Sequence, residues 1–193
     1  MKSLKNLLEN DVYLALIHYP VVNKKGDSIA SALTTIDMHD IARAGKTFGV
    51  KGIFIVTPLE DQKILAKEVI DHWVSGVGGQ INPFRKQALE LISITDSFDE
   101  AVERITKENG KPVISVATSA AGHKGAVSAE SFSQTIDNKF SYLITFGTAW
   151  GLSNDFIESC SNVLEPVKGV AGYNHLSVRS AVSILLDRIC RAE

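Results

Sequence analysis

Two short turns that contain glycine follow apolar segments in the second half of the chain, at residues 146–152 and 165–169. Glycine lets backbone amides approach a ligand closely. Residues 173–181 then open a helical pattern, and the N-terminus of a helix presents unpaired N–H groups. Together the three segments predict a pocket with backbone donors and an apolar floor, suited to a flat heterocycle. The alternative is that each glycine only ends a strand.

The first long helical pattern carries His39, Arg43 and Lys46 on the side opposite its apolar positions. Asp40 and Arg43 are three residues apart, so a solvent-exposed ion pair is one interpretation. The other is an arginine that faces the strand ends, where it would hold a phosphate or act on a hydroxyl. Histidines in expected loops or helix starts are more often surface residues than catalysts, and the others of this kind are His18, His123 and His175.

Several common motifs are absent or incomplete. Residues 45–47 resemble the end of a phosphate-binding loop, but Asp40 stands where that loop needs a glycine. The glycines at 76–79 do not complete a dinucleotide-binding pattern. No histidine pair has zinc-hydrolase spacing, no serine lies in a Gly-x-Ser-x-Gly turn, and Cys160 and Cys190 lack metal-binding spacing. We therefore predict no metal ion.

Short apolar runs alternate with helical patterns along the chain. This alternation predicts an α/β fold with a mainly parallel sheet and helices on both faces. Ligands of such sheets bind beyond the carboxyl ends of the strands, where the glycine turns fall. Residues 18–37, which include Lys24-Lys25-Gly26, form the main irregular stretch. Thr35 and Asp37 are available as caps of the first helix. Strands are expected at 12–17, 53–56, 112–117 and 142–146, weaker strands at 92–95 and 163–164, and helices around 41–48, 66–74 and 175–191.

The composition is that of an ordinary globular protein. With 193 residues, 45% hydrophobic and 22% charged, the chain is predicted to form a single domain over residues 1–193. No apolar run reaches membrane-span length, and the N-terminus lacks the apolar core of a signal peptide. The two cysteines fit a reducing, cytoplasmic location. Because the net charge is −2, a nucleic-acid partner would need a local cluster of lysine and arginine.

Three segments resemble motifs of the SPOUT superfamily, the trefoil-knotted S-adenosylmethionine-dependent RNA methyltransferases. Residues 37–43, followed by Phe48-Gly49-Val50, resemble the first motif of the branch that methylates ribose 2′-OH groups. Residues 166–169 resemble its Pro-x-x-Gly cofactor loop, and residues 146–152 resemble its middle motif. The chain is thus similar to this superfamily at the same segments that predict the pocket.

A closer similarity is to an uncharacterised RNA methyltransferase family within the superfamily, and it covers nearly the whole chain. It rests on His-Tyr-Pro-Val at 18–21 and Tyr-Asn-His-Leu-Ser-Val-Arg-Ser at 173–180. The chain also departs from the 2′-O-methylating branch. Asp37 stands where that branch has an asparagine, Ala149 where it has a glutamate, and His175 where it has its late asparagine.

The resemblance implies a C-terminal trefoil knot over about residues 112–191, with the turns at 117–119, 146–151 and 164–169 around S-adenosylmethionine. It also implies a homodimer that uses the exposed sides of the first and last helices. The cofactor-binding positions that it implies are Ala117, Thr118, Phe146, Gly147, Thr148, Gly151, Leu164, Glu165, Pro166, Gly169, Asn174, Leu176, Ser177 and Val178.

The resemblance also implies catalytic roles. Arg43 would lie at the catalytic centre, where it would position a phosphate or assist deprotonation. Asn174 and Ser177 would position groups near the methyl group, and His175 or His39 would accept a proton at neutral pH. The basic surface that RNA needs would consist of Lys24, Lys25, Lys46, Lys124, Lys168 and Arg179.

The sequence therefore predicts an enzyme that transfers a methyl group from S-adenosylmethionine to tRNA or rRNA. The acceptor would be a ribose 2′-OH or a base nitrogen such as guanine N1, and no membrane is involved. Two alternatives stay open. One is a non-catalytic module that binds S-adenosylmethionine or RNA, and the other is an enzyme that acts on a small phosphorylated metabolite.

Overall fold

Six parallel strands form one sheet in the computed structural model, which describes residues 9–170 and 173–191. Their order across the sheet is β5, β4, β1, β7, β6, β8. Because every neighbouring pair is parallel, the carboxyl ends of the strands lie at one edge of the sheet. The predicted α/β fold with a mainly parallel sheet is confirmed. The strands are β1 (Asp11–Ile17), β4 (Gly52–Val56), β5 (Ile92–Thr95), β6 (Val113–Ala117), β7 (Ser141–Gly147) and β8 (Asn162–Val163).

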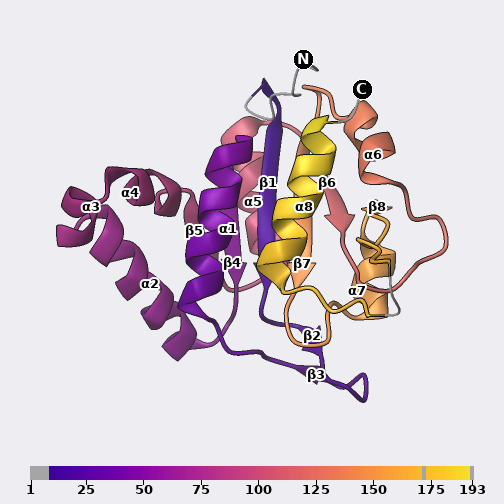
Figure 1. Ribbon diagram of the computed structural model, residues 1–193, viewed down its shortest axis with the longest axis horizontal. Coiled ribbons are helices and arrows are strands. Elements are labelled where there is room, and N and C mark those ends of the chain that lie inside the picture. Colours follow the sequence, from indigo (N-terminus) through magenta and orange to yellow (C-terminus); the bar gives the residue numbers. More distant parts are fainter. Residues whose placement is uncertain (1–8, 171–172, 192–193) are drawn as a thin grey trace.

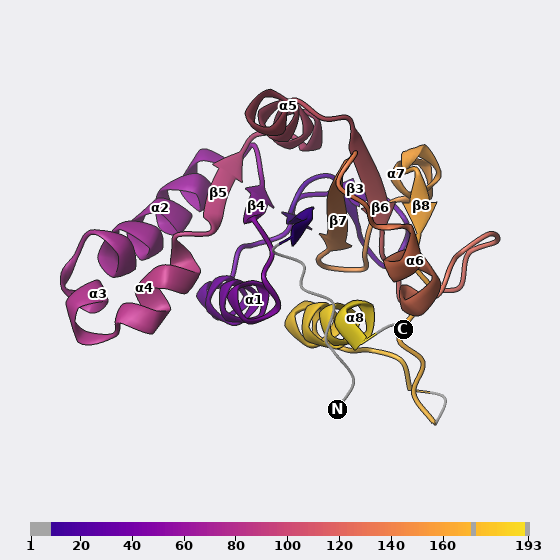
Figure 2. The same ribbon diagram turned by 90° about the horizontal axis from the view of Figure 1, so that it is seen from above.

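Helices cover both faces of the sheet (Figure 2). From residue 12 to residue 17, the even-numbered side chains of β1 pack in one core and the odd-numbered side chains in the other. This follows because successive side chains of a strand point to opposite faces. Helices α1 (Thr35–Phe48), α6 (Ala129–Thr135) and α8 (Val178–Arg191) contribute to the first core. Helices α5 (Phe98–Asn109) and α7 (Asn154–Ser159) contribute to the second.

An arm of three helices extends beyond the β5 edge of the sheet (Figure 1). It consists of α2 (Glu60–Val74), α3 (Val77–Ile81) and α4 (Pro83–Leu89). Trp73 joins the arm to α1, because Arg85 lies 4.5 Å over its ring and the His39 ring meets it edge-on at 5.6 Å. Near the carboxyl end of β1, β2 (Val21–Val22) and β3 (Ser28–Ile29) form a small antiparallel hairpin inside the stretch expected to be irregular.

The starts of two helices differ from the sequence-based expectation. Helix α8 begins at Val178 rather than near residue 175. The N-cap of α1 is Thr34, so Thr35 and Asp37 are wrong as caps, and no side chain caps the helix. The hydroxyl of Thr34 donates instead to the carboxylate of Asp37. That carboxylate also accepts a hydrogen bond from Arg179, a residue 142 positions away, which a local pattern cannot show.

We expect Gly45→Ala to lower the free energy of unfolding by about 1–3 kcal/mol, because overpacking strains a filled core. A Cβ atom at position 45 would lie 2.8 Å from Val50 and 2.9 Å from Ile53, where α1 packs on the sheet. Urea unfolding followed by circular dichroism measures the change. Lys46→Ala, an exposed position on the same helix, is the matched control and should change stability by less than about 0.5 kcal/mol. Equal stability of Gly45→Ala and the wild type would contradict the close packing.

Candidate active site

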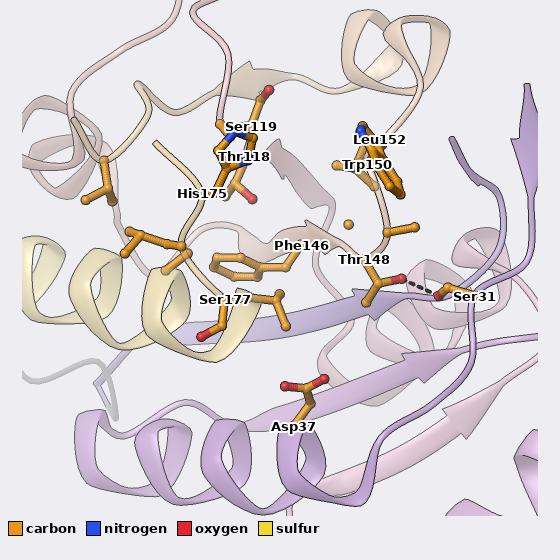
Figure 3. A pocket seen from close by; sticks show the side chains of 18 of the residues that line it. Ser31, Asp37, Thr118, Ser119, Phe146, Thr148, Trp150, Leu152, His175 and Ser177 are labelled. Carbon is orange, nitrogen blue, oxygen red and sulfur yellow. Dashed lines mark hydrogen bonds between the residues drawn. The ribbon is translucent and has the colours of Figure 1, made fainter. Parts of the chain in front are cut away.

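A cavity of about 680 Å³ lies beyond the carboxyl ends of β1, β6 and β7, beside the start of α8 (Figure 3). Its walls come from residues 31–37, 118–121, 146–152 and 174–185, together with Val167. Phe146 and Leu152 are buried side chains on its inner side. The cavity thus lies where the sequence predicted a pocket, and it has the apolar floor that was expected.

The turn at 147–152 is shaped by close backbone contacts. A Cβ atom on Gly147 would lie 2.6 Å from the backbone nitrogen of Leu152, so the turn has no room for a side chain there. Ala149 and Gly151 have φ angles of 52° and 103°, a region that L-residues rarely adopt. The amides of Thr148, Trp150 and Gly151 donate to carbonyl oxygens of Ile17, Val22 and Thr148, respectively. These three amides are therefore bonded within the protein and are not the free backbone donors that the glycine pattern suggested.

A chain of three polar side chains forms one wall of the cavity. The hydroxyl of Thr148 donates to the carbonyl of Ile17 at 2.9 Å. The Thr148 oxygen is therefore the acceptor for the hydroxyl of Ser31. Because the Ser31 hydroxyl donates its hydrogen to Thr148, the Ser31 oxygen accepts a hydrogen bond from His18 Nδ1 at 2.9 Å. His18 is only 1% exposed, and burial lowers its pKa although the nearby carboxylate of Asp37 opposes the shift. The sequence analysis gave no site role to His18 or Ser31.

Among the described residues that line the cavity, Asp37 is the one carboxylate, and its side chain is 12% exposed. Its Oδ1 accepts from the Arg179 guanidinium at 3.0 Å, and Arg179 also reaches Asp40 at 3.3 Å. These contacts join the first turn of α1 to the first turn of α8. Arg179 is therefore paired with two carboxylates here, although it was expected among the RNA-binding cations.

Ten of the expected site residues line the cavity. Asn174 donates from its side-chain amide to the carbonyl of Ala120 at 2.8 Å, which holds two walls together. Ser177 accepts from the backbone nitrogen of Ser180 at the start of α8. Five expected cofactor positions lie outside the lining: Ala117, Leu164, Glu165, Pro166 and Gly169. The ten that line it are Thr118, Phe146, Gly147, Thr148, Gly151, Asn174, His175, Leu176, Ser177 and Val178.

Two expected catalytic residues lie elsewhere. Arg43 is exposed and lines a second, shallower hollow of about 580 Å³ between α1 and α8, with Thr47, Arg179 and Ser183. His39 is half-buried against Trp73, where burial, and then the charge of Arg85, lower its pKa. A single chain therefore does not bring Arg43 or His39 to the cavity.

The cavity combines an apolar floor with hydroxyl groups and a paired carboxylate, which suits a small ligand that has both a planar apolar part and polar groups. Within residues 9–170 and 173–191, no three His, Cys, Asp or Glu side chains gather as metal ligands do. The same part of the chain contains no helix with both the length and the apolar character of a membrane span.

A comparison with known protein families shows which family the chain belongs to. A model of S-adenosylmethionine-dependent RNA methyltransferases matches residues 11–191, which is nearly the whole chain. The chain belongs to this family. The predicted membership of a family of S-adenosylmethionine-dependent RNA methyltransferases is confirmed.

Two relatives are similar to the chain in sequence. The chain is 43% identical over 179 residues to a tRNA (guanine-N(1)-)-methyltransferase of Oleidesulfovibrio alaskensis, a match that covers 93% of this chain and 42% of that protein. It is 35% identical over 184 residues to an uncharacterized protein of Aquifex aeolicus, covering 95% of this chain and 90% of that protein. The chain thus spans less than half the length of the relative with a named activity.

The fold is also that of SpoU methyltransferases. The SpoU methyltransferase AviRb of Streptomyces viridochromogenes superposes with a TM-score of 0.59 at 16% identity, over 95% of this chain and 60% of AviRb. A second structure of AviRb contains the cofactor AdoMet and superposes with a TM-score of 0.51 at 17% identity, covering 95% of this chain and 58% of AviRb. These likenesses confirm the expected similarity in fold.

We expect Gly147→Ala to weaken binding of S-adenosylmethionine by roughly tenfold or more, because the added Cβ forces the turn at 147–152 out of its position. Isothermal titration calorimetry measures the affinity. The matched control is Gly122→Ala, since a Cβ atom at the exposed position 122 meets nothing within 4 Å. Unchanged affinity in a folded Gly147→Ala variant would show that this turn does not shape the ligand site.

Stability should fall as the pH drops below about 6.5, with His18 as one cause. Burial lowers the pKa of His18, so the unfolded chain binds its proton more readily than the folded protein does. The stabilisation from neutral His18 is thus present above that pH and lost on acidification. His39 changes the stability in the same direction, because burial lowers its pKa as well.

Urea unfolding at pH 7.5 and pH 5.5 tests this expectation. In His18→Asn, whose amide can still donate to Ser31, the difference in unfolding free energy between the two pH values should shrink. His72→Asn, at an exposed position of α2, should keep the wild-type difference. An identical pH dependence in all three proteins would argue against the buried neutral histidine.

Proposed function

We propose that the cavity binds S-adenosylmethionine and that the enzyme methylates a nucleotide of tRNA or rRNA there. The observation that carries the proposal is the cavity itself, at the carboxyl ends of the strands in a member of an S-adenosylmethionine-dependent family. AdoMet bound to AviRb, a protein of the same fold, supports it. The cavity volume lies in the range of small-molecule sites, about 300–1,000 Å³. We further propose that no metal ion takes part.

The side chains of the cavity divide into an apolar floor and a polar wall. Phe146, Leu176 and Val178 would pack on the adenine ring, and the hydroxyls of Ser31 and Thr118 would meet polar groups of the cofactor. The bound cofactor supplies an activated methyl group. The protein has to align the nucleotide that receives the methyl group and to take up the proton that this nucleotide loses.

His175 is the candidate proton acceptor within the cavity. It is exposed at the cavity rim, and an imidazole can take up a proton near neutral pH. Asn174 holds the wall at Ala120 and would fix the neighbouring His175, while Ser177 fixes the start of α8. The acceptor would be a ribose 2′-OH or a base nitrogen. Guanine N1 is favoured by the names of two relatives, although the chain covers only 42% and 45% of them.

We propose that a homodimer completes the site. Arg43 points away from the cavity of its own chain, into the hollow between the exposed sides of α1 and α8. If these helices meet in a dimer, Arg43 approaches the cavity of the partner subunit. The guanidinium could then hold a phosphate of the RNA or assist deprotonation of the acceptor. His39, which neighbours the arm, remains a second candidate in the same interface.

We also infer that the chain is one domain with a trefoil knot over about residues 112–191. The support is the path of residues 164–165, which bond to Ala117 on one side and to Val127 on the other before the chain turns back to α8. We propose a cytoplasmic location as well, which fits a chain with only two cysteines and no disulfide framework in its sequence.

We expect Arg43→Ala to keep the affinity for S-adenosylmethionine and to lower methyl transfer on the order of a hundredfold, the usual effect of removing one group that stabilises developing charge. Transfer of a radiolabelled methyl group to total tRNA and rRNA measures turnover. Mass spectrometry of the digested RNA then identifies the methylated nucleoside. Lys51→Ala, which removes an exposed cation elsewhere, is the control. If the enzyme binds the cofactor but methylates none of the RNAs tested, the proposed substrate class is contradicted.

A mixing experiment tests whether the site is shared. Differently tagged Arg43→Ala and Gly147→Ala subunits are co-expressed and the mixed dimer is purified through both tags. One cavity of this dimer combines an intact Gly147 with Arg43 of the other subunit, so activity should return. A mixed dimer as inactive as its parents would contradict a shared site.

A further inference from the structure

Trp150 is an exposed tryptophan at the edge of the cavity. Its side chain is among the lining residues, yet 66% of its surface is exposed, whereas large aromatic side chains are usually well covered. The residue before it, Ala149, has a φ angle of 52°, which is uncommon for a residue other than glycine. Such backbone conformations persist where the surroundings hold them, and they often mark functional positions. The turn thus holds an indole ring in solvent beside the cavity.

The hairpin of β2 and β3 lies directly against this turn. The backbone nitrogen of Val22 donates to the carbonyl of Gly151 at 3.0 Å, and that of Trp150 donates to the carbonyl of Val22 at 3.1 Å. The tip of the hairpin carries Lys24 and Lys25, both exposed. The backbone therefore links two lysines to the position of the tryptophan.

The hairpin tip is ordered by its own hydrogen bonds. Asn23 Oδ1 accepts from the backbone nitrogens of Lys25 at 2.8 Å and Asp27 at 3.0 Å. The Asp27 carboxylate, the acidic group of the tip, is engaged by the Asn23 amide at 3.0 Å. The lysine ammonium groups accordingly stand on a defined loop and are available to an anion.

The opposite side of the cavity also carries aromatic rings. Tyr173 is 74% exposed and its ring meets that of His175 edge-on at 5.3 Å. In the view of Figure 3, His175 and Trp150 lie on opposite sides, with Phe146 between and below them. Planar groups thus flank the entrance on two sides.

From these observations we infer that Trp150 is a stacking platform for an unpaired nucleobase of the RNA substrate, and that Lys24 and Lys25 bind the phosphates beside that base. The inference rests on the proposed methylation of RNA at this cavity and specifies the form of its substrate. Aromatic rings next to cations are the pattern with which proteins bind single-stranded RNA. Because a base inside a duplex is covered by its neighbours, the RNA must be single-stranded or have its base flipped out at this point.

Fluorescence of Trp150 tests the inference directly. The chain contains two tryptophans, so Trp73→Phe leaves Trp150 as the single indole emitter. This variant, saturated with S-adenosylhomocysteine, is titrated with a single-stranded oligoribonucleotide and with a blunt RNA duplex of the same sequence. We expect the single strand to quench the emission and the duplex to leave it nearly unchanged. Equal quenching by both would overturn the inference.

Substitutions separate stacking from electrostatics. Trp150→Ala should weaken single-strand binding on the order of tenfold, whereas Trp150→Phe should retain most of the affinity. Lys24→Ala combined with Lys25→Ala should reduce the dependence of binding on salt, which Trp150→Ala should leave unchanged. A Trp150→Ala variant that binds RNA as the wild type does would refute the stacking role.

The same variants show whether Trp150 covers the cofactor instead. Calorimetry with S-adenosylmethionine in the absence of RNA measures how much cofactor affinity Trp150→Ala loses. We expect this loss to be clearly smaller than the loss of RNA affinity, and an equal loss of both would contradict the inference. Its failure can be told apart from failure of the proposed function. Methyl transfer to RNA that is insensitive to Trp150 refutes stacking alone, whereas cofactor binding without methylation of any RNA refutes both.

Discussion

The pairing of β1 with β7 is the constraint on which the site depends. The two strands are matched residue by residue from Asp11 with Ser141 to Ile17 with Gly147, although about 130 positions separate them in sequence. This register brings the turn after β7 beside the segment that follows β1. Ser31 can then reach Thr148, and Val22 can reach Trp150 and Gly151. A shift by one residue would exchange the two cores and separate these partners.

The sequence was sufficient for the strands, the alternation and the place of the cavity, because continuous apolar runs and glycine turns are local signals. It was not sufficient for the groups that form the polar wall. His18 lies at the start of a stretch without periodicity that also contains Ser31, and Thr148, the partner of Ser31, lies more than a hundred residues away. The role of Asp37 was also hidden, since its partner Arg179 is on the last helix.

The structure also divides the expected site into two parts. The residues for the cofactor gather in the cavity at the strand ends, whereas Arg43 lies in the hollow between α1 and α8. Arg179 stands between the two, since it lines the hollow and binds the one carboxylate of the cavity wall. Its pairing with Asp37 and Asp40 offsets part of their negative charge at the point where the two regions meet. A family motif in sequence does not reveal such a division, because it orders residues along the chain and not in space.

The hairpin and the cavity turn are joined by main-chain hydrogen bonds, and this has a consequence for the hairpin tip. Val22, Trp150 and Gly151 use only their amides and carbonyls in this connection, so it does not depend on the side chains at the hairpin tip. The exposed residues at the hairpin tip can consequently be exchanged while the main-chain bonds between the hairpin and the cavity turn are kept.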